Sequence, residues 1–187
     1  MNIYWEDRFI SLLNKNPKTS LEVEEMEYAR EQFEIELRKE TEKLLEEIKS
    51  KGLTITEIWD LVNTKKSYPE VIENLTNHLS YPYHHKNKEG IIRALGVKEA
   101  GIKTISALLV EYRNCSNKYI SDAIILSIFN IIKPNNAKKL FDQTNESDIL
   151  LRDILQVFID NKKTNFNQFY RLFIENFEQR LVFQTLK

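Results

Sequence analysis

The chain contains very few of the residues that interrupt or cross-link a backbone: its 187 residues include four glycines, four prolines and one cysteine. So little glycine and proline disfavours β-structure, which needs both at its many turns, and favours long helices. A single cysteine, Cys115, cannot form an intramolecular disulfide, so we expect a reducing compartment. Four glycines also leave little with which to bind phosphate, and no P-loop, dinucleotide fingerprint or G-x-S-x-G motif is present.

Long hydrophobic runs and a strong net charge are also missing. No segment reaches the roughly 18 apolar residues of a membrane span, and no basic-then-apolar leader opens the chain, so we expect a cytoplasmic protein with no membrane partner. The net charge is −1. Residues 1–83 carry 11 basic and 17 acidic side chains, however, and residues 84–187 carry 16 basic and 11 acidic ones. This asymmetry fits either a basic binding surface or attraction between the two halves.

Apolar residues at helical spacing are present along most of the chain. With 42% hydrophobic residues, the chain can bury a core in one domain. The spacing predicts a short helix over residues 2–14. Thr19 and Glu22 then form a capping-box pair, and a helix can run from there to Lys51, where Gly52 ends it. This helix is about 30 residues, or roughly 45 Å, long.

One apolar stripe runs along the long helix, and its other faces are strongly acidic. The stripe consists of Met26, Phe33, Leu37, Leu44 and Ile48. The acidic residues are Glu24, Glu25, Glu27, Glu31, Glu34, Glu36, Glu40, Glu42, Glu46 and Glu47. The helix is either a solvated one that packs its stripe on the rest of the chain, or a coiled-coil or partner-binding arm.

The segment from Ser67 to Gly101 predicts a pair of antiparallel helices. Ser67 and Glu70 match a capping box. The apolar stripes of the two helices are Val71, Ile72, Leu75 and Leu79, and then Ile91, Ile92 and Leu95. Gly96 is expected as a left-handed C-cap. Before this unit, a capping pair of Thr54 and Glu57 predicts a helix that contains Trp59 as a core anchor.

Further helices predict a solenoid, because neither helix of the central unit can bury its stripe alone. They are expected over Ile102–Tyr112, Ile120–Ile131, Asn135–Phe141 after Pro134, and Ile149–Ile159. A shift of 34 residues aligns Ile91–Gly96 with Ile125–Asn130. An aromatic stripe beginning at Phe166 predicts a final helix that caps the stack.

The runs IWDLVNTKKSYPEVIENLTNHL and YHHKNKEGIIRALGVKEA, from about Ile58 to Ala100, resemble the HEAT-like repeat proteins and, among them, an uncharacterised bacterial group. Phe129 and Asn130 depart from the Leu-Gly ending of the central copy. The resemblance implies an all-α superhelix of about three repeats with a binding role, and it brings no catalytic residues. We expect residues 1–62 to form an N-terminal helical region, residues 63–163 the repeats, and residues 164–187 the capping helix, all in one continuous domain.

Candidate chemical groups are few. His78, His84 and His85 lack the spacing of a zinc site, and adjacent histidines in a loop usually point apart. Cys115 follows a predicted helix C-terminus, which disfavours a thiolate. We therefore predict no catalytic residue, metal or cofactor.

Lys86, Lys88, Arg93, Lys98 and Lys103 form a basic array around the second helix of the central unit. This array is solvated charge, a protein-binding surface or a phosphate-binding surface. The predicted binding surface consists of Tyr83, His84, His85, Lys86, Lys88, Glu89 and Arg93. The predicted function is a non-catalytic protein–protein interaction module with an unidentified protein partner. The alternatives are a nucleic-acid-binding solenoid of the base-excision type and, from a distant likeness, a pigment lyase.

Overall fold

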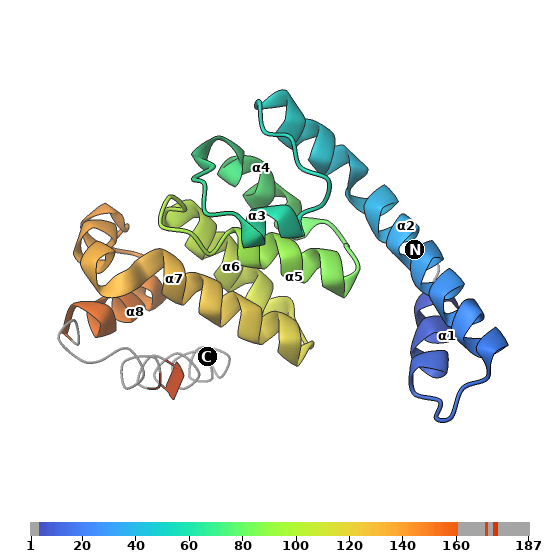
Figure 1. Cartoon of the computed structure of the whole chain (residues 1–187). Coiled ribbons are helices and arrows are strands. Elements are labelled where there is room, and N and C mark those ends of the chain that lie inside the picture. Colours follow the sequence, from blue (N-terminus) through green and yellow to red (C-terminus); the bar gives the residue numbers. More distant parts are fainter. Residues whose placement is uncertain (1–3, 161–170, 172–173, 176–187) are drawn as a thin grey trace.

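The computed structural model describes residues 4–160, 171, 174 and 175, and in this part of the chain it contains helices and loops but no strand (Figure 1). The predicted all-α class is therefore confirmed. The helices are α1 Tyr4–Leu13, α2 Ser20–Ser50, α3 Trp59–Asn63, η1 Pro69–Val71, α4 Ile72–Asn77, η2 His78–Ser80, α5 His85–Ala94, α6 Ile102–Asn114, α7 Lys118–Gln143 and α8 Ile149–Asp160. The predicted capping helix over residues 164–187 lies outside the described residues.

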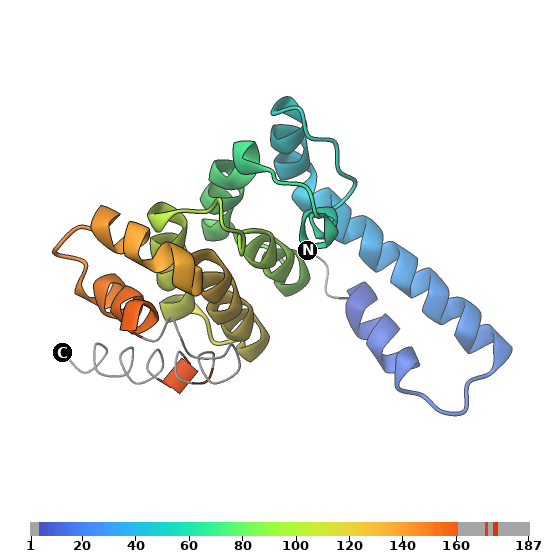
Figure 2. The ribbon, with the colours of Figure 1, turned by 60° about the vertical axis from the view of Figure 1, so that its left-hand side comes forward.

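The N-terminal helices form an antiparallel hairpin, which we define as residues 4–35. The predicted capping box of α2 is confirmed, because Thr19 N donates to Glu22 Oε2 at 2.9 Å and Glu22 N donates to Thr19 Oγ1 at 3.3 Å. Gly52, with a φ of +87°, lies just beyond the helix end. Figures 1 and 2 show that α1 lies along the N-terminal half of α2 and that this half projects away from the other helices.

Residues 53–160 form the body, onto which the C-terminal half of α2 packs. Leu44 and Ile48 of the predicted stripe are fully buried in the same core as α4, α5, α6, α7 and α8. Within the body, α5 packs mainly on α3 and α7, and α7 also packs on α6 and α8. The predicted α8 stripe of Leu151, Ile154, Leu155 and Phe158 is completely buried.

The predicted break before Pro134 is also confirmed. Lys133 has φ 35° and ψ 144°, outside the helical region, and it divides α7 in two. The ring of a proline disfavours helical geometry in the residue before it, so Pro134 explains the kink.

Three local predictions in and before the central unit are wrong. Ser67 does not cap a helix, since its hydroxyl donates to Glu99 Oε1 at 2.7 Å. The helix predicted from Thr54 starts only at Trp59. Gly96 does not adopt positive φ. It is instead a point of close approach, where a Cβ would lie 3.1 Å from the Ser127 Cα of α7.

Candidate functional site: the junction between hairpin and body

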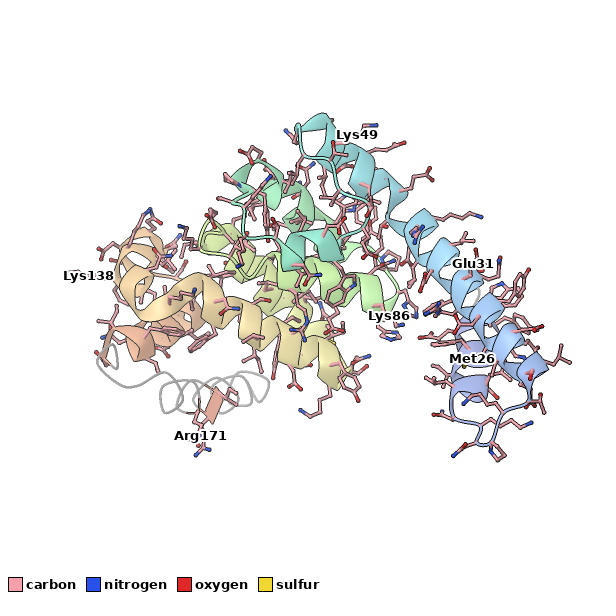
Figure 3. The ribbon with its side chains drawn as sticks, in the orientation of Figure 1. Met26, Glu31, Lys49, Lys86, Lys138 and Arg171 are labelled. Atoms are coloured by element: carbon pink, nitrogen blue, oxygen red, sulfur yellow. The ribbon has the colours of Figure 1, made fainter. Side chains whose placement is uncertain are left out.

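Two polar networks join α1 and α2 to the body. Figure 3 shows Lys86 at the end of α5 that faces α2, and this end carries the first network. His84 is the N-cap of α5, because its Nδ1 accepts a hydrogen bond from Lys86 N at 3.3 Å. This bond leaves the ring proton on Nε2, which donates to Glu6 Oε2 of α1 at 2.8 Å. A residue of the first helix is thus bonded to one 78 positions later.

His85 turns toward the same carboxylate. Its Nε2 lies 3.7 Å from Glu6 Oε1, and the His84 and His85 ring centroids are 4.0 Å apart. Burial, followed by the electrostatic effect of the neighbouring His84, lowers the pKa of His85 below its usual value of 6.5, which favours a neutral imidazole at neutral pH. The sequence-based expectation that adjacent histidines point apart does not hold here.

Glu40 of α2 completes the first network. Its Oε1 accepts the backbone N–H of His84 at 2.9 Å, and its Oε2 accepts the side-chain amide of Asn87 at 2.6 Å. Phe33 packs edge-on against the His84 ring, and Lys86 Nζ lies 4.8 Å from the Phe33 ring centroid. The hairpin end nearest the body is therefore held by charge-assisted hydrogen bonds and aromatic packing.

The second network surrounds His78, whose side chain is buried. The Tyr83 hydroxyl lies 2.5 Å from His78 Nδ1, and Glu47 Oε2 lies 3.1 Å from His78 Nε2. Burial raises the pKa of Tyr83 to about 12, so its hydroxyl stays protonated and donates to His78. A hydrogen bond from Asn74, and then the neighbouring His78, hold the pKa of Glu47 below its ordinary value of 4.5. The Tyr81 ring stacks on His78, with centroids 4.6 Å apart.

Most of the predicted binding residues make contacts within the protein. Tyr83 and His84 point into the two networks, and the Lys88 side chain is only 11% exposed. Its ammonium donates to Leu79 O and Tyr81 O and pairs with Glu111 at 3.0 Å. Glu89 and Arg93 pair with each other at 2.7 Å, while His85 and Lys86 are the exposed members of the set.

Four of the five cations of the predicted basic array lie near carboxylates of the same chain. Besides the Lys88 and Arg93 pairs, Lys103 lies 3.0 Å from Glu73, and Lys98 lies 4.0 Å from Glu99. Among these residues, each ammonium or guanidinium except that of Lys86 has a carboxylate within 4.0 Å. The array therefore provides little uncompensated charge for phosphate groups.

Exposed apolar side chains gather on the hairpin, a feature that the sequence interpretation missed. Leu21 is 73% exposed and Tyr28 is 53% exposed. The other large apolar side chains exposed on the hairpin are Tyr4, Ile10, Leu13, Val23 and Ile35. For the members on α2, the signal that could have found them is their position off the predicted stripe of Met26, Phe33 and Leu37, among acidic residues that point to solvent.

Comparison of the chain with protein-family models, with curated proteins and with solved structures finds no match. Among the helices that the structure describes, none combines the length and apolar character needed to cross a membrane.

Proposed function

We propose that the protein is a non-catalytic interaction module in which a HEAT-like solenoid body presents the N-terminal hairpin to a protein partner. The observation that carries this proposal is the group of exposed apolar side chains on the projecting hairpin. Tyrosine and large aliphatic residues that are ringed by polar groups resemble the anchors that provide most of the affinity in protein interfaces.

The solenoid part of the proposal rests on packing order and on the resemblance of residues 58–100. In the body, α5 packs on α7, α6 on α7, and α7 on α8, so that each of these helices packs on one that lies one or two helices away in the sequence. Burial between elements that are close in sequence is the basis of repeat architecture. A rigid stack of this kind provides a fixed base for the hairpin.

The charge of the hairpin indicates the chemistry of its partner. Residues 4–35 carry eight acidic and four basic side chains. The Arg8 guanidinium pairs with Glu25, and the Lys15 ammonium pairs with Glu22. Because the acidic side chains outnumber the basic ones, the hairpin has a net negative charge. A complementary partner surface has an apolar groove bordered by lysine and arginine.

The nucleic-acid alternative has less support. An acidic hairpin repels phosphate, and the basic array is paired within the body. Phosphate contacts would have to displace these internal carboxylates before any counterion release could favour binding.

Affinity capture with matched variants tests the proposal. The test variant is Leu21→Gln with Val23→Gln, and the control is Tyr119→Gln, since Tyr119 on α7 is 76% exposed. Because two exposed aliphatic contacts are worth roughly a tenfold or greater change in affinity, we expect the test variant to lose the partner and the control to retain it. A partner that both variants recover equally would contradict the proposal. Recovery of nucleic acid that falls steeply with salt would favour the alternative.

A further inference from the structure

The strongest unassigned cluster of potential ligands is formed by Glu6, His84 and His85. One ligand atom from each of the three residues lies within 4.8 Å of the other two, although the residues come from α1 and from the start of α5. The Glu6 and His84 side chains are 11% and 9% exposed, and the His85 side chain is 44% exposed. Two imidazoles and a carboxylate converge there, and one side stays open to solvent.

We propose that Glu6, His84 and His85 form a site for a borderline divalent metal ion of the zinc class. In tetrahedral coordination with bonds of 2.0–2.1 Å, ligand atoms lie about 3.4 Å apart. The distances of 2.8 Å and 3.7 Å from the two imidazole Nε2 atoms to Glu6 oxygens bracket this value. Two imidazole nitrogens with one carboxylate suit zinc, cobalt or nickel better than magnesium or calcium.

Metal binding requires that each imidazole present a ring nitrogen that carries no proton. For His84, the ring proton moves from Nε2 to Nδ1 on binding, and the long 3.3 Å bond from Lys86 N is given up. The metal thus replaces a proton in the Glu6–His84 contact.

The surroundings provide the negative charge that a cation needs. Glu40 binds the backbone of His84, and Phe33 packs on its ring. Glu36 lies between these two on the same face of α2, because residues three and four apart share a face. Its Oε2 is buried and has no hydrogen-bond partner among the described residues. The face of α2 that contacts His84 therefore carries the carboxylates of Glu36 and Glu40, and the Lys86 ammonium lies over Phe33.

The metal would act as a link between hairpin and body. It would join residues 78 positions apart in the chain and so reduce the opening of α1 away from α5. The fourth coordination position, on the exposed side of His85, is left for water. The site is independent of whatever the apolar side chains of the hairpin bind.

Calorimetric titration with Zn²⁺ tests the site, using metal-free protein that carries no histidine tag. The absorption spectrum of bound Co²⁺ reports the coordination geometry. We expect one equivalent to bind the wild type, and binding at least tenfold weaker in His85→Gln and in Glu6→Gln. His85 is partly exposed, so its variant should fold normally by circular dichroism. The controls Asp7→Asn and Cys115→Ser should bind as the wild type does. Addition of Zn²⁺ should slow the hydrogen exchange of the α1 backbone amides in the wild type. The same addition should not change their exchange in His85→Gln.

Equal affinity of the wild type and His85→Gln would overturn the proposal, as would the absence of saturable binding near one equivalent. Loss of binding in Cys115→Ser would also overturn it, because the thiol would then be a ligand.

Discussion

Replacing Glu40 by alanine tests how the hairpin is held to the body. The carboxylate accepts two hydrogen bonds, from His84 N at 2.9 Å and from the Asn87 amide at 2.6 Å. Hydrogen bonds to a charged group contribute about 1.5–3 kcal/mol each. Since Glu40 is only half-buried and Asn87 keeps its bond to Leu37 O, we expect Glu40→Ala to lower the free energy of unfolding by about 2–4 kcal/mol.

Glu42→Ala is the matched control for this prediction. Glu42 lies on the same helix, is exposed, and takes part in no hydrogen bond or ion pair within the part of the chain that the structure describes. Its replacement should change stability by less than about 0.5 kcal/mol. Urea unfolding measures both variants, and thermal unfolding should show a midpoint lower by about 5–15 °C for Glu40→Ala. Equal stability of the two variants would refute the role assigned to Glu40.

Three further predictions concern the body and the second network. Gly96→Ala should destabilise the fold by about 1–3 kcal/mol, because a Cβ would lie 3.1 Å from the backbone of α7. The control Gly101→Ala has no atom within 4 Å of its Cβ position, so it should change stability by less than about 1 kcal/mol. Denaturant titrations measure both variants. Tyr68→Phe should cost about 1–3 kcal/mol in the same assay, since the hydroxyl donates to two buried backbone carbonyls at 2.9 Å and 3.2 Å. The folded-state pKa of Glu47 is lowered, so its stabilising effect is complete above pH 4.5 and is lost as the pH falls through the lowered pKa. Unfolding curves from pH 7 to pH 3 should therefore show wild type and Glu47→Gln converging at the acid end, and a constant gap would argue against this assignment.

The helices themselves could be predicted because their signals are local. The apolar spacing of α2, α6 and α8 and the Pro134 break each depend on residues within a few turns of one another. The capping box at Thr19 formed because its two hydrogen bonds join residues only three positions apart, and Lys15 binds the other carboxylate oxygen of Glu22. Local chemistry and the final fold agree at these positions.

The failures share one physical cause, which is competition from distant residues. Ser67 has the same local capping pattern as Thr19, yet Glu99 accepts its hydroxyl proton from 32 positions away. Gly96 follows a helix as a left-handed cap would, but its lack of a Cβ serves the contact with α7. No sequence spacing reveals such partners.

The same limit applies to the candidate site. The basic turn was found from its composition, but the inward direction of His84 and Lys88 depends on Glu6 and Glu111, far away in the chain. The convergence of His84 and His85 on one carboxylate also required α1 to fold back along α2. The exposed apolar side chains of the hairpin became visible only when the buried face of α2 was known.

Site-specific crosslinking tests the central claim, that the hairpin is the contact surface, most directly. A photo-crosslinking amino acid would replace Leu21 in one version of the protein and Tyr119 in another, both exposed positions. We predict a single dominant protein adduct from position 21 and none from position 119. Adducts only from position 119, or equal adducts from both, would contradict the claim.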